Sequence, residues 1–313
     1  MGRYREIDLS NLKRYNAADR YSKVQAASLA APLNVNLNDF WQALPEILKA
    51  AELREFIEIC AQSVHKQKPL LLGAGGHVIK CGLAPLIIDL MKLGAIGVVA
   101  VNGAVVIHDY ELAVWGKTSE DVDTALLDGS FGMAADTADN LNSIITDAYK
   151  NNLGLGEAVG FWLSENAPYK ENSLLAKAYQ YGVPVTVHVA IGTDIIHQHA
   201  SADGAAIGAA SLRDFRIFCQ CLASLEDGGV FINLGSGVII PEVFLKALSV
   251  ARNLGHPLRE LNTAVFDMNV QYRPLVNVTQ RPVQPSGKGF YFVGHHELML
   301  PLFFLSLKEK LTQ

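Results

Sequence analysis

Short apolar runs alternate with longer segments of helical periodicity along most of the chain, and this alternation predicts the fold. The runs with the length and composition of strands are residues 69–73, 97–101, 183–190, 229–234, 262–266 and 290–293. They are continuously apolar, which is typical of strands that helices cover on both faces. The pattern therefore predicts an α/β fold of the Rossmann-like type: a doubly wound, mostly parallel sheet with helices on both faces.

Helical periodicity is clearest over residues 40–65, 77–94, 131–151, 171–182, 204–226, 240–254 and 296–310. Gly182 is the last residue of one of these segments and Gly255 directly follows another, as expected for glycines that end helices. Residues 1–36 are polar with scattered apolar positions. We therefore expect an N-terminal arm over residues 1–36, followed by a single α/β domain over residues 37–313.

The composition excludes several classes of protein. Of the 313 residues, 50% are hydrophobic and only 18% are charged, so intrinsic disorder is excluded and a large core is available. The 26 Lys and Arg residues against 31 Asp and Glu leave a net charge of -5, and the chain has no basic block. Proteins bind nucleic acids mainly by neutralising phosphates with clustered Lys and Arg side chains, so we expect no nucleic-acid partner. The acidic balance favours a cationic small molecule as ligand.

Cysteine usage and hydropathy indicate where the chain is expected to reside. Its four cysteines have no C-x-x-C spacing, which favours a reducing compartment over a disulfide framework. The first residues include no apolar segment of the secretory type. The longest uncharged apolar stretch, Leu93 to Val101, is far shorter than the roughly 20 residues that cross a bilayer. We expect a cytoplasmic protein with no membrane partner.

Small and polar residues follow most of the predicted strands. Because the carboxyl ends of parallel strands share one edge of a sheet, these residues should converge there and bind a ligand, such as a nucleotide. Neither glycine-rich loop completes G-x-G-x-x-G, since Val78 and Ile240 occupy the third glycine positions. The candidate cofactor-binding residues are Gly73, Gly75, Asn102, Gly103, Ala104, Gly192, Thr193, Gly235, Ser236, Gly237 and Asp267.

Lys288 lies between two glycines, directly before an aromatic strand. Burial against apolar walls lowers the pKa of a lysine and makes the amine a nucleophile that can form a Schiff base. Most lysines in such turns are solvated cations, so both readings of Lys288 stay open at this point.

Several separate segments resemble the deoxyhypusine synthase family, from about residue 69 to the C-terminus. Leu261-Asn262-Thr263-Ala264 followed by Phe266-Asp267 is similar to the family's nicotinamide-nucleotide strand. Gly287-Lys288 resembles the segment that carries the catalytic lysine, and Val101-Asn102-Gly103-Ala104 with Asp109 and Glu111 resembles a loop that contacts cofactor and polyamine. The loops Gly192-Thr193-Asp194 and Gly235-Ser236-Gly237 resemble further cofactor loops.

The resemblance implies NAD as cofactor and a polyamine such as spermidine as substrate. In that family NAD takes a hydride from spermidine, and an aminobutyl group passes through an enzyme lysine imine to an acceptor amine. By this resemblance Lys288 is the catalytic nucleophile, while Asp109, Glu111 and Asp194, with the neighbouring His108, bind substrate. Asn262, Thr263 and Ala264 contact the cofactor, and Asp267 lies at the ribose. Family members are homotetramers, so a homo-oligomer is expected.

The chain also departs from the family pattern. Met268-Asn269-Val270-Gln271-Tyr272 replaces the Gly-Ser-Asp-Ser-Gly run, and Gln284, Ser286 and Gly182 replace an acid, a tryptophan and a histidine on the substrate side. We therefore expect a deoxyhypusine synthase-like paralogue with a different amine substrate or acceptor, where the acceptor is a protein or a small amine.

Two alternatives stay open. The first is a metal-dependent hydrolase that uses Asp194, His197 and His199, with His295, His296 and Glu297 nearby in the last helix. The second is a paralogue that binds a nucleotide without turnover. In the preferred interpretation no metal is bound, and Lys80 and Cys81 are assigned no chemistry.

Overall fold

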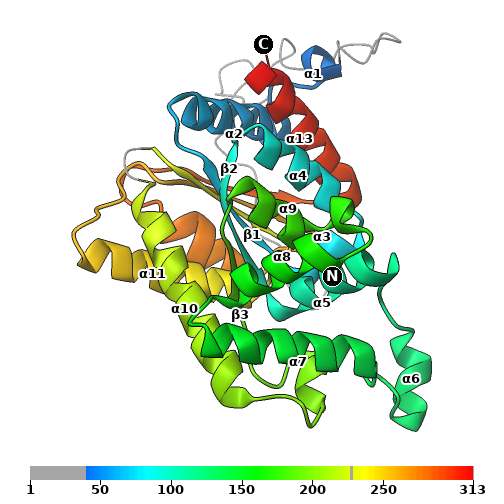
Figure 1. Cartoon of the computed structure of the whole chain (residues 1–313). Helices are drawn as coiled ribbons and strands as arrows, with labels where there is room; N and C mark the ends of the chain where they lie inside the picture. The colour runs from blue at the N-terminus through cyan, green and yellow to red at the C-terminus, as the bar shows by residue number, and fades with distance from the viewer. Residues whose placement is uncertain (1–39, 226–227, 313) are drawn as a thin grey trace, which may run out of the picture. The chain divides into compact units, whose positions relative to one another are not determined.

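The computed structural model describes residues 40–225 and 228–312, and its strands form one parallel sheet (Figure 1). The strand order is β3-β2-β1-β4-β5-β6, and each neighbouring pair is parallel. The strands are β1 (Leu70–Ala74), β2 (Ile96–Asn102), β3 (Val185–His188), β4 (Val230–Leu234), β5 (Asn262–Asp267) and β6 (Gly289–Val293). The predicted Rossmann-like parallel sheet is confirmed, and each strand overlaps the apolar run that predicted it.

Helices connect the strands. They are α1 (Phe40–Ala43), α2 (Leu48–His65), α3 (Gly76–Lys80), α4 (Ala84–Lys92), α5 (Gly103–Trp115), α6 (Val122–Asp128), α7 (Ala135–Lys150), α8 (Leu155–Asn166), α9 (Leu174–Tyr181), α10 (Gly204–Ala223), α11 (Ile239–Asn253), α12 (Tyr272–Pro274) and α13 (His296–Thr312). Shorter turns are η4 (Lys170–Asn172), η5 (Ile195–Gln198) and the π-helical η6 (Leu275–Gln280).

The structure differs from the predicted helices in three respects. The predicted helical segment over residues 40–65 is divided into α1 and α2, with residues 44–47 outside both helices. The predicted helix over residues 77–94 is divided into α3 and α4, because Gly82 between them has a left-handed φ of 73°. Helices α5, α6 and α8 were not predicted from the apolar periodicity. In α5 buried residues lie on several sides of the helix, so the segment has no single apolar stripe to detect.

Aromatic side chains fill the core on both faces of the sheet. On one face Phe231 of β4 stacks on Phe244 of α11, with ring centroids 3.9 Å apart. On the other face Phe266 of β5 packs against Phe303 of α13 at 5.0 Å and against Phe56 of α2 at 6.4 Å. Each fully buried phenylalanine contributes about 1.5–3 kcal/mol through removal of apolar area from water. The predicted cover of helices on both faces is thus confirmed.

The sheet has two chemically different edges. At the carboxyl edge the chain leaves β1, β2, β4 and β5 through Gly75, Gly103, Gly235 and Met268. At the amino edge it enters the strands, including β5 at Asn262 and β6 just after Lys288. In the order 3-2-1-4-5-6 the connections diverge between β1 and β4, which is where ligands bind to folds of this class.

The described chain from Leu53 onward forms one compact unit, and the described residues from Phe40 to Glu52 group separately. The predicted arm over residues 1–36 lies outside the described residues, and the single domain from residue 37 stays a prediction. Within the described ranges, no helix combines the length and the apolar character that crossing a membrane requires.

Candidate functional site

The loops after β1 and β4 meet at the carboxyl edge of the sheet. The Gly75 amide donates a hydrogen bond of 2.9 Å to the Leu234 carbonyl oxygen. A Cβ atom on Gly75 would lie only 2.5 Å from the Gly235 carbonyl oxygen, so a side chain at residue 75 would push the two loops apart. Gly235 has a left-handed φ of 61°, which a glycine adopts without strain. Bare backbone therefore lines the divergence point between β1 and β4.

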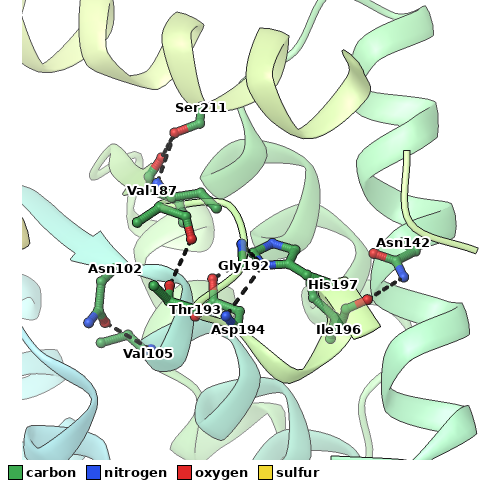
Figure 2. Close-up of polar contacts among 12 residues, drawn as sticks. Asn102, Val105, Asn142, Val187, Gly192, Thr193, Asp194, Ile196, His197 and Ser211 are labelled. Carbon is green, nitrogen blue, oxygen red and sulfur yellow. Dashed lines mark hydrogen bonds and ion pairs between the residues drawn. The ribbon is translucent and has the colours of Figure 1, made fainter. Parts of the chain in front are cut away.

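The loop after β2 begins helix α5 and contacts the segment after β3. The Asn102 side chain accepts a hydrogen bond of 3.3 Å from the Val105 amide and so caps the N-terminus of α5 (Figure 2). A Cβ atom on Gly103 would overlap the Asp194 carboxylate. The absence of a side chain at residue 103 thus allows a buried carboxylate to lie against the start of α5.

Several of the predicted substrate-binding residues line one cavity. It has a volume of about 150 Å³ and adjoins a second cavity of about 470 Å³, with which it shares Glu111, Ser119 and Glu120. His108, Glu111 and Asp194 line the smaller cavity, together with the predicted cofactor residues Ala104 and Thr193. Three of the four predicted substrate-binding residues therefore meet next to the loop after β2.

A hydrogen-bonded chain fixes the tautomer of His108. The Thr118 hydroxyl donates to Glu111 Oε2 at 2.5 Å, and Thr118 Oγ1 lies 2.8 Å from His108 Nδ1. A hydroxyl has a single hydrogen, and here Glu111 accepts it, so Nδ1 of His108 must be the donor to Thr118. This leaves a lone pair on Nε2. Burial, followed by the charge of Lys80, lowers the pKa of His108, which favours the neutral imidazole.

The cavity has an excess of acidic groups. Glu111, Glu120 and Asp194 line it, against the single cation Lys80 among its described lining residues. Burial raises the pKa of Asp194 to about 6, so its carboxylate is ionised above that pH. Carboxylates around a small cavity attract cationic ligands and suit an ammonium group.

Asp109, the fourth predicted substrate-binding residue, has a different environment. Its carboxylate is fully buried and accepts hydrogen bonds from Ser173 Oγ at 2.6 Å, the Leu174 amide at 2.7 Å and the Leu175 amide at 3.0 Å. These donors belong to the first turn of α9 and the residue before it. The geometry assigns Asp109 to holding α9 in place of the predicted contact with substrate.

Lys288 and three of the predicted cofactor residues lie at the amino edge, away from the glycine loops. The Lys288 amide donates to Asn262 Oδ1 at 3.1 Å, and the Thr263 amide donates to the Lys288 carbonyl oxygen at 2.8 Å. The Lys288 ammonium group forms an ion pair with Glu55, and 62% of the Lys288 side chain is exposed. A strand the length of β5 spans roughly 17 Å. Within one chain the structure thus separates Lys288, Asn262, Thr263 and Ala264 from the carboxyl edge.

Other predicted cofactor residues have local structural roles. Gly73 lies inside β1, where a Cβ atom would overlap Ile240 of α11. Ser236 Oγ accepts from the Ile240 amide at 3.2 Å, and a Cβ atom on Gly237 would overlap Gln271. The Asp267 carboxylate accepts from the Met268 amide at 2.7 Å and from Gln271 Nε2 at 2.9 Å. Asp267 therefore orders its own loop, and the ribose contact that the resemblance implies stays a prediction.

The histidines of the metallohydrolase alternative do not converge. His197 Nδ1 accepts hydrogen bonds from the amides of Gly192 at 3.1 Å and Asp194 at 3.3 Å, as Figure 2 shows. His199 Nε2 lies 2.8 Å from the Gly132 carbonyl oxygen. His197 also lies 3.9 Å from the Asp194 carboxylate through Nε2, but among the described residues neither histidine belongs to a group of three potential metal ligands.

Thr118, Glu120 and Lys80 line or order the cavity but were absent from the predicted site. The signal that could have found part of this arrangement is the helical spacing of Ala104, Ile107, His108 and Glu111, which lie at i, i+3, i+4 and i+7 on one face of α5.

The fold places the chain among Rossmann-like α/β proteins. No family model matches the sequence, and no curated protein matches it. A solved structure of similar fold is a proposed deoxyhypusine synthase from Entamoeba histolytica, with 12% identity, 87% of this chain and 93% of that chain covered, and a TM-score of 0.52. Unliganded AgrE aligns at 12% identity over 84% of this chain and 32% of its own, with a TM-score of 0.50.

A conserved LOR/SDH-type protein from Methanococcus maripaludis S2 aligns at 15% identity over 84% of this chain and 68% of its own, with a TM-score of 0.46. AgrE is much longer than this chain, which spans about a third of its length. At these identities the likeness shows the fold alone.

Proposed function

We propose that this protein is an NAD-dependent enzyme that oxidises a cationic amine at the carboxyl edge of the sheet. The observation that carries the proposal is the cavity in which His108, Glu111 and Asp194 meet beside the loop after β2. In this proposal a dinucleotide binds along the loops after β1, β2 and β4, where the connections of the fold diverge. The resemblance of separate sequence segments to deoxyhypusine synthases supports NAD and a polyamine in particular.

The residues of the cavity have complementary roles in this proposal. Glu111, Glu120 and Asp194 bind the ammonium groups of a diamine or polyamine. NAD would be held by the loops after β1, β2 and β4, and it would supply the acceptor for the hydride that leaves the carbon bearing the reacting amine. The amine nitrogen gives its proton to the Nε2 lone pair of His108, so that a carbon–nitrogen double bond forms and charge is balanced. The Thr118–Glu111 chain then stabilises the imidazolium that results.

Transfer of an aminoalkyl group needs a second amine close to this imine. Lys288 of the same chain lies at the opposite edge, so its predicted role requires that a neighbouring copy bring it to the cavity. Within one chain the lysine that lines the cavity is Lys80. A lysine imine at either residue, and the homotetramer that the family resemblance implies, stay predictions.

The test combines NAD binding with turnover. Calorimetry should detect NAD binding to the purified chain, and spermidine or putrescine should produce NADH, which absorbance follows. We expect the His108→Gln protein to keep NAD affinity and lose about 10²–10⁴-fold in kcat, because the base is missing. His65→Gln, an exposed histidine at the end of α2, is the matched control and should behave as the wild type.

Failure has distinct forms. Absence of NAD binding would refute the whole proposal. NAD binding without turnover of any di- or polyamine would favour the non-catalytic nucleotide-binding alternative. Borohydride trapping with spermidine and NAD, followed by peptide mass mapping, separates the transfer routes, since the adduct mass would lie on Lys80, on Lys288 or on neither.

A further inference from the structure

His77, Cys81 and Glu297 come together at the carboxyl edge of the sheet, although Glu297 is 216 residues from Cys81 in the sequence. His77 is the second residue of α3 and Cys81 is the residue that ends it, so the pair lies four residues apart on one side of a helical turn. Glu297 is in the first turn of α13, which follows β6. Two chain segments thus present three different ligand types to one point.

The two distances from Cys81 Sγ are close to those between ligand atoms of a tetrahedral metal site. Cys81 Sγ lies 3.3 Å from His77 Nε2 and 3.7 Å from Glu297 Oε2, and the three ligand atoms lie within 4.8 Å of one another. With Zn–S bonds of about 2.3 Å and Zn–N or Zn–O bonds of about 2.0–2.1 Å, ligand atoms of a tetrahedral site are about 3.3–3.6 Å apart. Small adjustments of exposed side chains would therefore complete the geometry.

His296 provides a second, independent observation beside this cluster. Only 1% of the residue is exposed, and its Nε2 lies 3.1 Å from the Phe266 carbonyl oxygen. A carbonyl can only accept, so Nε2 carries the hydrogen and Nδ1 carries a lone pair. Among the residues that the structure describes, Nδ1 has no hydrogen-bond partner. The His296 ring centroid is 5.5 Å from the His77 ring centroid, so this buried imidazole lies beside the cluster.

We propose that His77, Cys81 and Glu297 bind a divalent transition-metal ion of the zinc type. One thiolate and one carboxylate balance its two positive charges, and the neutral imidazole supplies the third ligand. Three protein ligands leave the fourth tetrahedral position open for water or a substrate oxygen, which is the arrangement of catalytic zinc sites. The Nδ1 lone pair of His296 suits a hydrogen bond from a water in that position. The site does not depend on NAD or on the acidic cavity.

Cobalt titration tests the site directly. Full-length protein is treated with chelator, desalted and titrated with Co²⁺ alone, whose thiolate complexes have a charge-transfer band in the near ultraviolet. We expect one Co²⁺ per chain with this band, no band in Cys81→Ser, and at least about tenfold weaker binding in Glu297→Gln. Cys221→Ser, which removes another partly buried thiol, is the control and should keep the full band. A wild-type protein without the band, or a Cys81→Ser protein that keeps it, would overturn the proposal.

Thiol protection gives a readout that needs no variant. The chelator-treated wild-type chain is alkylated with iodoacetamide with and without Zn²⁺, and the labelled peptides are mapped by mass spectrometry. Zn²⁺ should slow labelling of Cys81 at least about tenfold, while Cys221 labelling stays unchanged and excess chelator restores the rate. Equal labelling of Cys81 in both conditions would contradict the site even if every variant failed to fold.

Discussion

Asp109 offers the sharpest separation of a structural role from a substrate-binding role. In Asp109→Asn an amide NH₂ replaces one carboxylate oxygen, and each of the two oxygens faces at least one backbone amide of α9. The variant therefore loses at least one hydrogen bond to a charged acceptor, about 1.5–3 kcal/mol, and leaves a buried N–H group unsatisfied, about 1–3 kcal/mol. We expect the free energy of unfolding to fall by about 2.5–6 kcal/mol, out of a typical total of about 5–15 kcal/mol.

Urea unfolding at pH 8 measures this loss. Burial raises the pKa of Asp109 to about 6, so the wild-type carboxylate is ionised at that pH. Glu111→Gln is the control, because its partners Thr118 and Thr137 are hydroxyls that can reorient to donate or accept. The control should lose less than about 1 kcal/mol of stability but bind polyamine more weakly. An Asp109→Asn protein of wild-type stability with weakened polyamine binding would refute the structural role.

Three further predictions concern other parts of the chain. Burial raises the pKa of Asp214 to about 7, above its unfolded value of about 3.9, so its contribution to stability is largest at low pH and is lost as pH rises through 7. Unfolding at pH 5 and pH 8 should show the advantage of wild type over Asp214→Asn growing by about 2–3 kcal/mol toward pH 5; a constant difference would contradict this. Gly75→Ala should weaken NAD binding, measured by calorimetry, at least about tenfold, or about 1.4 kcal/mol, and an unchanged NAD affinity would contradict this. The control is Gly208→Ala, on α10, where the added methyl group meets no atom within 4 Å; it should raise the free energy of unfolding by about 0.5–1 kcal/mol. Lys288→Ala should change the free energy of unfolding in urea by less than about 1 kcal/mol and leave NAD affinity unchanged, because the ion pair of Lys288 with Glu55 is exposed. A larger loss of stability or of NAD affinity would contradict this prediction.

Much of the fold could be predicted because buried parallel strands leave a strong signal. Each continuous apolar run became a strand, and the residues that follow β1, β2 and β4 do meet at one edge. The same rule also places Lys288, which precedes β6, at the opposite edge. The family resemblance nevertheless grouped Lys288 with the residues of the carboxyl edge, because a match of short sequence segments does not show which end of a strand a residue occupies.

The cavity could be predicted only in part, because α5, the helix that carries His108 and Glu111, was missed. Without α5, nothing distinguishes His108 from Asp109, since adjacent residues differ only by their direction around the helix axis. In the structure His108 lines the cavity, whereas Asp109 points to α9. The cluster of Cys81 with Glu297 was beyond sequence reasoning for another reason: no local spacing relates a residue of α3 to one of α13.

The contact between Gly103 and Asp194 has a consequence for how this chain can diversify. Because a methyl group at residue 103 and a carboxylate at residue 194 compete for the same volume, residue 103 cannot gain a side chain unless residue 194 becomes smaller. Relatives that recognise neutral or anionic compounds should therefore exchange both positions together, with a bulkier residue at the first accompanied by a smaller one at the second. In an alignment of relatives, such a paired replacement would identify the branch on which the preferred charge of the ligand changed.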